Sequence, residues 1–363
     1  MFLNLPSPTG LSGFYVVFDG STNLEATGTR GASHLVEHLV CRSFKDMRDE
    51  LDRHGIEWNA TTTANYVVFY FTGLESSIKK YRGKLLDRIY DFRIEKSDFE
   101  SERKIVLEEY SDTFSRHPAR HMLNTYRKHL NSHMPIGSRE DLQDLRWIDL
   151  LGFYEKNFMR PTKVISVSRS GKFGSSSVDF SDGAHVPEYH LAEYKNKLEP
   201  APPKKEKSSI IVLSSLMAEN LDKLRVLSMV IGKGLGSPLY QEVRERLALC
   251  YTISSDVDRF GGQAIMKIQT STQSAHADKA LSAIKKILRD PSKHVTKRRV
   301  DLIVDLLKAQ EMKGEINRYK NVDRFIDPEH YDIYRDLKKV TRKSVLDAFE
   351  TAFASAEPTV SVD

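Results

Sequence analysis

The sequence predicts an α+β protein of two similar domains, each a mostly antiparallel sheet covered by helices. Strand-like and helical segments alternate in both halves of the chain, without the regular strand–helix–strand rhythm that builds a parallel sheet. A stretch rich in Gly, Ser, Pro and charged residues divides the chain into halves of comparable size. The 363 residues are also enough for two domains of ordinary size.

The elements of the first half follow from apolar periodicity and from turn residues. The predicted strands, which are β-branched and aromatic, are 12–20, 57–73 (two strands or one bent strand) and 163–171. The predicted helices are 31–45, 46–55, 74–92, 95–115 and most of 116–156. Gly55 is expected to end the second helix, and Ser97 or Asp98 to cap the fourth.

The second half repeats this order of elements, although its residues do not align with those of the first half. The predicted strands are 208–216, 251–257 and 263–272. The predicted helices are 220–234, 237–250, 276–290 and 296–314. We therefore expect a first domain at residues 1–172, a linker at 173–207 and a second domain at 208–363.

The composition is that of an ordinary globular protein, with 40% hydrophobic and 29% charged residues. The net charge of +5 is mild, and the basic runs carry no nucleic-acid-binding motif, so we expect no nucleic-acid partner. No apolar run approaches the ~20 residues needed to cross a bilayer, and the first residues do not resemble a signal peptide. We therefore expect no membrane association and a cytoplasmic location. Cys41 and Cys250 lie far apart in apolar segments and are expected to be buried thiols.

The segment GASHLVEHLV (31–40) brings two imidazoles and a carboxylate close together in the sequence. On a helix, His34 and His38 are i and i+4, so they lie on one face with Glu37 beside it. Such a pair can bind one Zn²⁺, and Glu37 would then reach a zinc-bound water rather than the metal. This H-x-x-E-H order is the inverzincin signature. The alternative is that both histidines only satisfy polar contacts in the core.

A third metal ligand is expected from the helix that contains ESERKIVLEEY. Glu102 and Glu109 are seven residues apart, so their carboxylates share one face of this helix. The apolar residues between them indicate a partly buried helix, in which each carboxylate needs a partner. A cation held by the first helix would provide one. The alternative is a charged helix on the surface.

Several segments in this order resemble the insulinase (pitrilysin) family of zinc peptidases, which includes the mitochondrial processing peptidase. The H-x-x-E-H motif is followed by ERKIVLEE (102–109), and NAT (59–61) is similar to the Asn-Ala that precedes that family's substrate-binding edge strand. Residues 134–168 resemble the stretch that closes its first domain. GSPLYQEVRERLALCY (236–251) is similar to its Arg and Tyr motif. The resemblance extends over most of the chain.

The resemblance implies a role for each matching residue of the first half. His34, His38 and Glu109 would be the zinc ligands, and Glu37 the general base. Glu102 would be a carboxylate that supports a ligand. Glu108 is the rival of Glu109, but only Glu109 keeps the seven-residue relation to Glu102.

The resemblance also implies substrate contacts and a partner. Asn59 and Ala60 would bind substrate beside the edge strand. Arg244 and Tyr251, on the second domain, would help to hold the substrate and the oxyanion. Since one pair of domains resembles the half-length members that must associate with another chain, we expect a homodimer.

The expected function is therefore a zinc-dependent endopeptidase that binds peptides or unfolded segments in extended form. Zn²⁺ is the expected cofactor, with Glu37 as the base that activates the attacking water. Two alternatives remain open. One is a scaffold or interaction subunit of a peptidase-like complex without useful activity, and the other is a zinc hydrolase for a non-peptide substrate.

Overall fold

The computed structural model of the chain describes residues 2–7, 11–115, 121–122, 124–125, 134–169, 207–217, 221–260, 263–316, 322–326, 340–353 and 359–362. The chain divides into two compact units. The first is drawn from Met1–Asp112, Asn131–Tyr194 and Gly314–Pro328, and the second from Thr113–Leu130, Lys195–Lys313 and Glu329–Asp363. The predicted linker 173–207 lies outside the described residues except for Lys207, and so does most of the predicted helical stretch between 116 and 133.

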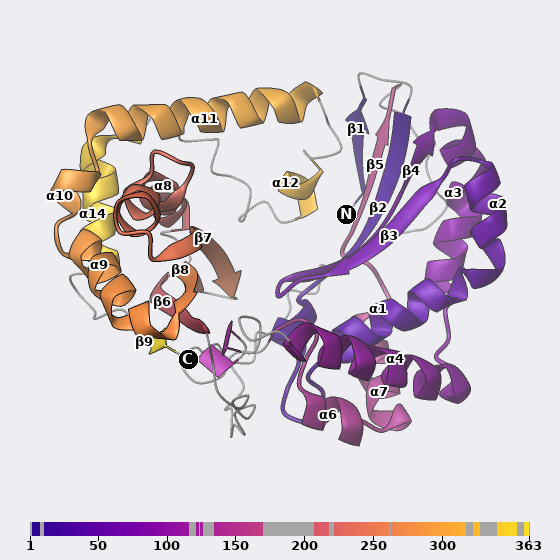
Figure 1. The fold of residues 1–363 in the computed structure, drawn as a ribbon. Helices are drawn as coiled ribbons and strands as arrows, with labels where there is room; N and C mark the ends of the chain where they lie inside the picture. Colours follow the sequence, from indigo (N-terminus) through magenta and orange to yellow (C-terminus); the bar gives the residue numbers. More distant parts are fainter. Residues whose placement is uncertain are drawn as a thin grey trace. The chain divides into compact units, whose positions relative to one another are not determined.

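The first unit is built on a five-stranded sheet with the strand order β1-β5-β2-β4-β3 (Figure 1). Its strands are β1 (Phe2–Pro6), β2 (Leu11–Asp19), β3 (Glu57–Thr62), β4 (Tyr66–Leu74) and β5 (Lys163–Ser168). β1 and β5 are parallel, and every other neighbouring pair is antiparallel. The segment predicted as two strands or one bent strand is thus a hairpin of β3 and β4, and β3 forms an edge of the sheet.

Both faces of this sheet are covered. Successive side chains of a strand point to opposite faces, so Phe14 and Tyr15 on β2 lie on different sides. The ring of Phe14 stacks on that of Phe71 at a centroid distance of 4.7 Å. Tyr15 belongs to a hydrophobic cluster that includes Val322 and Ile326 from the late segment of the chain. β2 is therefore buried along most of its length.

The helices of the first unit cover the sheet or extend from its ends. They are α1 (Ala32–Ser43), α2 (Arg48–Arg53), α3 (Glu75–Tyr90), α4 (Lys96–Ser115, whose last turn is assigned to the second unit), α6 (Arg139–Asp144), α7 (Trp147–Asn157) and α12 (Asp323–Ile326), with short 3₁₀ turns η1 (Ser21–Leu24) and η2 (Lys45–Met47). α1 packs against β3 and β4, and α3 against β2 and β4. The predicted cap of α4 is wrong, because the helix begins at Lys96 and both Ser97 and Asp98 lie in its first turn.

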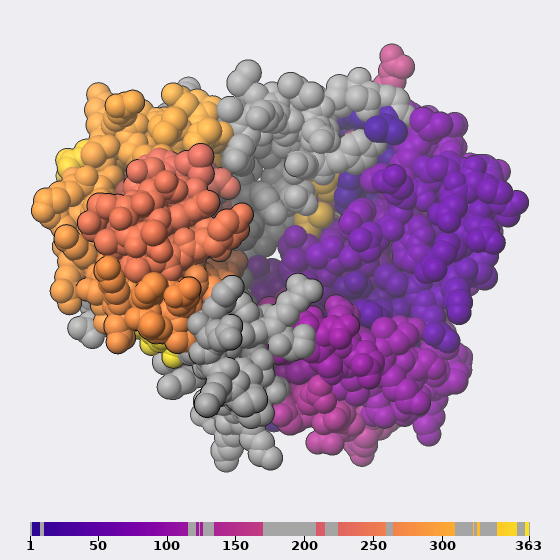
Figure 2. Space-filling model, viewed as in Figure 1, coloured from indigo at the N-terminus to yellow at the C-terminus, as the bar shows by residue number. Residues whose placement is uncertain are grey.

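The second unit is built on an antiparallel sheet with the strand order β7-β8-β6-β9 (Figure 1). Its strands are β6 (Lys207–Met217), β7 (Cys250–Phe260), β8 (Gln263–Gln273) and β9 (Thr359–Val362). Its helices are α8 (Leu221–Gly232), the π-helical η4 (Tyr240–Arg246), the 3₁₀ turn η5 (Ser274–His276), α9 (Ala277–Arg289), α10 (Pro291–His294), α11 (Lys297–Ile316) and α14 (Arg342–Phe353). Leu227, Ile268, Ile284 and Phe349 pack between them in a single core. Figure 2 shows the outer surface of this unit in orange and yellow.

The predicted fold class is confirmed, since each unit is a mostly antiparallel sheet covered by helices. One helix of the second half is shorter than expected. The helix predicted at 237–250 ends at Arg246, Ala248 has a positive φ of 52°, and Cys250 begins β7. In the described parts of the chain, no helix combines the length and the apolar character that spanning a membrane requires.

Candidate metal centre

The helix α1 carries the H-x-x-E-H segment and has an unusual first turn. Gly31, its N-cap, has a left-handed φ of 95° and offers no side chain to the free backbone N–H groups. The buried carboxylate of Glu25 accepts from the N–H of Gly31 at 2.8 Å and from that of Ser33 at 2.7 Å. A carboxylate at a helix N-terminus also opposes the positive end of the helix dipole. Glu25 therefore fixes the start of the helix close to His34.

A close backbone contact holds the same end of α1. A Cβ atom added to Gly137 would lie 2.4 Å from the Cα of Gly31 and 2.6 Å from the carbonyl oxygen of Arg30. A Cβ atom added to Gly31 would lie 2.9 Å from the carbonyl oxygen of Ile136. Both positions therefore require glycine, and the loop before α6 fixes where α1 begins.

Three donor atoms converge between α1 and α4. Oε2 of Glu109 lies 3.7 Å from Nε2 of His34 and 3.3 Å from Nε2 of His38. One atom from each of these residues lies within 4.8 Å of the other two. Glu108, the rival carboxylate, is exposed and does not take part in this cluster. Two imidazoles and one carboxylate are suitable ligands for zinc, so the residues present fit the expected metal.

The two histidines differ in their affinity for protons. Burial and the nearby His38 lower the pKa of His34 to about 4, although Glu109 and Glu25 oppose this shift. Burial also disfavours the charged form of His38, but its hydrogen bond to Glu109 and the charges of Glu109 and Glu37 outweigh it and raise its pKa. A metal needs neutral imidazoles. His34 is therefore already in its metal-binding form near neutral pH, whereas a metal competes more strongly with a proton at His38.

Glu37 lies beside this cluster and is tied to the edge strand of the sheet. The hydroxyl of Thr62, the last residue of β3, donates a hydrogen bond to Oε2 of Glu37. Burial raises the pKa of Glu37, although this hydrogen bond and the proximity of His38 act in the opposite direction. A carboxylate with a raised pKa is a stronger proton acceptor, as a general base requires.

A second carboxylate of α4 supports the cluster from behind. Oε2 of Glu102 lies 3.4 Å from Nδ1 of His38, the ring nitrogen on the side opposite Glu109. Oε1 of Glu102 accepts from the guanidinium of Arg42 at 2.8 Å. The same guanidinium donates to Asp98 at 2.8 Å. His38 is thus linked to an ion-pair network between α1 and α4.

The predicted substrate-binding residues Asn59 and Ala60 lie on β3, at the edge of the first sheet. Asn59 is exposed, and its side-chain oxygen accepts from the backbone N–H of Ala60 at 2.9 Å. Ala60 is buried and pairs with Phe69 of β4. The strand that carries them ends at Thr62, the residue that binds Glu37.

Arg244 and Tyr251 lie in the second unit and are neighbours in space. The guanidinium carbon of Arg244, on η4, lies 5.0 Å from the centre of the Tyr251 ring at the start of β7. It lies 4.6 Å from the ring of Tyr240. Tyr251 is 81% exposed, which is unusual for a large aromatic residue. The two predicted residues therefore form one cation–π pair, in which Tyr251 is exposed and Arg244 is half-buried.

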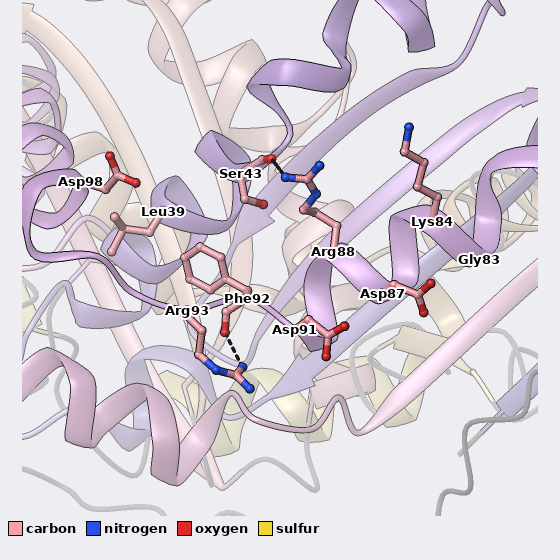
Figure 3. Close-up of a pocket in the computed structure, with 10 residues that line it drawn as sticks. All are labelled: Leu39, Ser43, Gly83, Lys84, Asp87, Arg88, Asp91, Phe92, Arg93 and Asp98. Atoms are coloured by element: carbon pink, nitrogen blue, oxygen red, sulfur yellow. Dashed lines mark hydrogen bonds between the residues drawn. The ribbon is translucent and has the colours of Figure 1, made fainter.

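A pocket of about 580 Å³ lies at the C-terminal end of α1, away from the three donor atoms. It is lined by Leu39, Ser43, Gly83, Lys84, Asp87, Arg88, Asp91, Phe92, Arg93 and Asp98 (Figure 3). Arg88 donates to the carbonyl of Ser43 at 3.1 Å, and Arg93 to that of Phe92 at 2.8 Å. Neither histidine lines this pocket. Its connection with the metal centre is Asp98, which binds Arg42.

Sequence reasoning did not identify Thr62, Arg42, Asp98 or Glu25 as parts of the site. A signal existed for two of them. Arg42 follows His38 by four residues and Asp98 precedes Glu102 by four, so each extends a helix face that was already assigned. Thr62 and Glu25 carry no such spacing, because their contacts depend on how the turns fold.

The amino-acid sequence of the chain matches two protein-family models. Residues 7–135 match the model described as "Insulinase (Peptidase family M16)". Residues 183–307 match the one described as "Peptidase M16 inactive domain". The first match contains all residues of the cluster around His34 and His38, and the second contains Arg244 and Tyr251.

Known proteins are similar to this chain over different lengths. An "Uncharacterized zinc protease" of Mycobacterium leprae is 24% identical over 295 residues, which cover 73% of this chain and 65% of that protein. The beta subunit of the mitochondrial-processing peptidase of Neurospora crassa is 24% identical over 161 residues, which cover 40% of this chain and 33% of that subunit. The chain therefore spans less than two thirds of either relative.

A solved structure extends the likeness to the fold. The crystal structure of a protease from Helicobacter pylori superimposes with a TM-score of 0.80 at 16% sequence identity, covering 99% of this chain and 97% of that one. Two family models in the expected order, related sequences and a shared fold agree with each other. The chain therefore belongs to the insulinase family, peptidase family M16.

Proposed function

We propose that the protein is a zinc-dependent endopeptidase whose metal is held by His34, His38 and Glu109. The observation that carries this proposal is the convergence of three suitable donor atoms within 4.8 Å of one another. Three protein ligands leave a position for water, as a catalytic zinc site requires. The relative from Mycobacterium leprae, named a zinc protease, supports the same metal.

Glu37 is proposed as the general base. A zinc ion at this site would lower the pKa of a bound water and polarise a peptide carbonyl. Glu37 accepts a proton from the attacking water and delivers it to the leaving amine. Its raised pKa supports proton uptake, and the hydroxyl of Thr62 orients the carboxylate for it.

The substrate is proposed to be an extended peptide that adds to the sheet along β3, beside Asn59 and Ala60. β3 has β4 on one side only, so its other side has no strand partner among the described residues. Main-chain hydrogen bonds along such an edge give affinity with little dependence on the peptide sequence. Because β3 leads to Thr62, a peptide on this edge would approach the proposed base.

Arg244 and Tyr251 are proposed to act at the metal centre of a second chain in a homodimer. The exposure of Tyr251 and the position of Arg244 against its ring leave both polar groups near the surface. A guanidinium and a phenol are suitable donors for the substrate carbonyl and for the charge that develops on it. In this arrangement, each active site would combine residues of two chains.

An interaction or scaffold subunit is the second candidate. It is favoured by the description of the family model that residues 183–307 match, which names an inactive domain. Such a subunit would bind peptides without cleaving them, and its function would not need Glu37.

The decisive experiment is a panel of quenched fluorescent peptides incubated with the purified protein. The proposal expects cleavage that a chelator abolishes, that added zinc restores, and that Glu37→Gln lacks while keeping its metal. Peptide binding without cleavage under all conditions would support the scaffold instead. Hydrolysis of small esters or amides but of no peptide would identify a different zinc hydrolase.

A further inference from the structure

The contacts between α1 and α4 form an ordered series, which we call the α1–α4 ladder. Its members on α1 are His34, His38 and Arg42, and its members on α4 are Glu109, Glu102 and Asp98. Each set recurs at helical spacing, so each lies along one face of its helix. The residue numbers rise along α1 and fall along α4, so the two helices run in opposite directions. The proposed metal ligands lie at one end of the ladder and the ion pairs of Arg42 lie at the other.

Arg42 occupies the end of the ladder away from the proposed metal. Its guanidinium donates to Glu102 and to Asp98, each at 2.8 Å, and so holds two carboxylates of α4 with one rigid group. The side chain of Glu102 is only 8% exposed, whereas that of Asp98 is 41% exposed and lies at the rim of the pocket beside Leu39 (Figure 3). Glu102 is therefore the partner with little access to water.

The two oxygens of Glu102 have different neighbours. Oε1 binds Arg42, and Oε2 faces Nδ1 of His38 at 3.4 Å. With its first oxygen held by Arg42, Glu102 presents the second to the ring as an acceptor. A proton on Nδ1 leaves Nε2 with a free lone pair, and this is the nitrogen that faces Glu109 at 3.3 Å.

We propose that Arg42 is a positioning residue of the metal centre. It holds Glu102 so that Glu102 accepts the Nδ1 proton of His38, which fixes the tautomer in which Nε2 can bind the metal. Carboxylates that orient a ligand histidine in this way change metal affinity when they are altered. This inference rests on the proposed metal centre, and it assigns to Arg42 a role exerted through Glu102 and not on the substrate.

Arginine suits this role better than lysine would. Its planar guanidinium offers several N–H groups in fixed directions, so one side chain can bind two carboxylates at once. A lysine keeps the charge but not this geometry. Arg42→Lys should therefore restore only part of what Arg42→Gln removes.

The test measures metal affinity and the tautomer of His38 separately. Zinc affinity is measured by competition with a chelating dye for wild type, Arg42→Gln, Arg42→Lys, Glu102→Gln and the double variant Arg42→Gln/Glu102→Gln. Thermal unfolding of the metal-free proteins establishes that each variant is folded. Arg146→Gln is the matched control, because Arg146 also binds a carboxylate, that of Asp149, with two nitrogens at 2.6 Å on the same unit.

The expected result is a loss of zinc affinity of about 10- to 100-fold in Arg42→Gln, partial recovery in Arg42→Lys and none in the Arg146 control. Arg42→Gln should cause no further loss in the Glu102→Gln background, because its effect passes through Glu102. Equal losses in both backgrounds would show that Arg42 only packs the helices together, and the inference would be wrong.

The tautomer is read in the metal-free proteins by NMR of ¹⁵N-labelled histidine at about pH 9, well above the ordinary histidine pKa of about 6.5. Both proteins also carry Glu109→Ala, because the Glu109 carboxylate would otherwise compete with Glu102 for the ring proton. With Arg42 intact, His38 should carry its proton on Nδ1, and Arg42→Gln should move population to Nε2. An unchanged tautomer in Arg42→Gln would overturn the inference. If wild type bound no zinc, the proposed function would fail, but this comparison would still decide the role of Arg42.

Discussion

Nε2 of His38 lies 3.3 Å from Oε2 of Glu109, and this contact joins two helices that are separated in sequence by η2, α2, the β3–β4 hairpin and α3. His34 reaches the same carboxylate oxygen at 3.7 Å. One oxygen atom is therefore the meeting point of the three proposed ligands. Changes at Glu109 should act on the metal before they act on the fold, because its side chain is 46% exposed.

Glu109→Gln should lower the zinc content from about one per chain to near zero, because an amide is a much weaker zinc ligand than a carboxylate. Metal analysis by mass spectrometry of the purified proteins measures this. Glu108→Gln is the matched control, being exposed on the same turn of α4 and outside the cluster. If Glu108→Gln lost the zinc and Glu109→Gln kept it, the third zinc ligand would be Glu108 and not Glu109.

Thr62→Val should reduce kcat/KM for a peptide by about 10- to 100-fold while the zinc content stays unchanged. The substitution removes the hydroxyl that binds Glu37 but keeps the shape of the side chain. A hydrogen bond to a charged group contributes about 1.5–3 kcal/mol, which corresponds to this change in rate. Thr61→Val, at the exposed neighbouring position of β3, should cleave at the wild-type rate. Equal activity of both variants would remove Thr62 from the mechanism.

Zinc binding at about pH 6 should release about one proton from the two histidines. At this pH His34, whose pKa is lowered to about 4, is already neutral, whereas His38, whose pKa is raised, is still mostly protonated. Apparent affinity should therefore weaken as the pH falls, by about tenfold per unit while one proton is displaced.

Calorimetry in buffers of different ionisation enthalpy counts the protons released. His54→Gln, which removes a histidine between α2 and α3, is the control and should release the same number. Release of two protons at this pH would mean that His34 is not held neutral before the metal binds.

A peptide bound to the inactive Glu37→Gln protein should lie antiparallel or parallel to β3 as an added strand. The free edge of β3 and its link to Glu37 through Thr62 give the physical reason. A crystal structure of this complex tests the position directly. Peptide bound as a helix, or on the second sheet, would contradict the prediction.

The Glu37→Gln and Tyr251→Phe proteins should each have little activity alone. Activity should return when the two proteins are unfolded and refolded together. In a mixed homodimer, one site would combine an intact Glu37 of one chain with an intact Tyr251 of the other. Native mass spectrometry confirms that mixed dimers have formed. Mixed dimers without recovered activity would show that Tyr251 does not serve the site of a partner.

The sequence was most informative where the residues of a motif lie on one helix. His34, Glu37 and His38 share α1, and their spacing alone places them side by side. Glu102 and Glu109 could be assigned to one face of α4 for the same reason. Such local patterns do not specify which residues of other elements complete the cluster. Thr62 reaches Glu37 only because the β3–β4 hairpin brings the end of β3 beside α1.

The elements that the sequence did not reveal have identifiable causes. β1 (Phe2–Pro6) and β9 (Thr359–Val362) are short edge strands whose pairing partners are far away in sequence. The cap of α4 was misplaced because Asp98 is a common capping residue, but its carboxylate is used by Arg42. α14 could have been found, since its buried residues recur at helical spacing; they are Val345, Ala348, Phe349 and Ala352.

The close contact between Gly31 and Gly137 fixes the position of α1, which carries the two histidines of the metal centre. The carboxylates of the centre lie on α4, which this contact does not involve. Any side chain at position 137 would press on the backbone where α1 begins. Because His34 and His38 lie on that one rigid helix, they would move together and lose their common alignment with Glu109. Engineering of the site to bind another metal should therefore leave α1 unchanged and substitute Glu109 or Glu102 on α4. A single substitution there changes one carboxylate without displacing the two histidines.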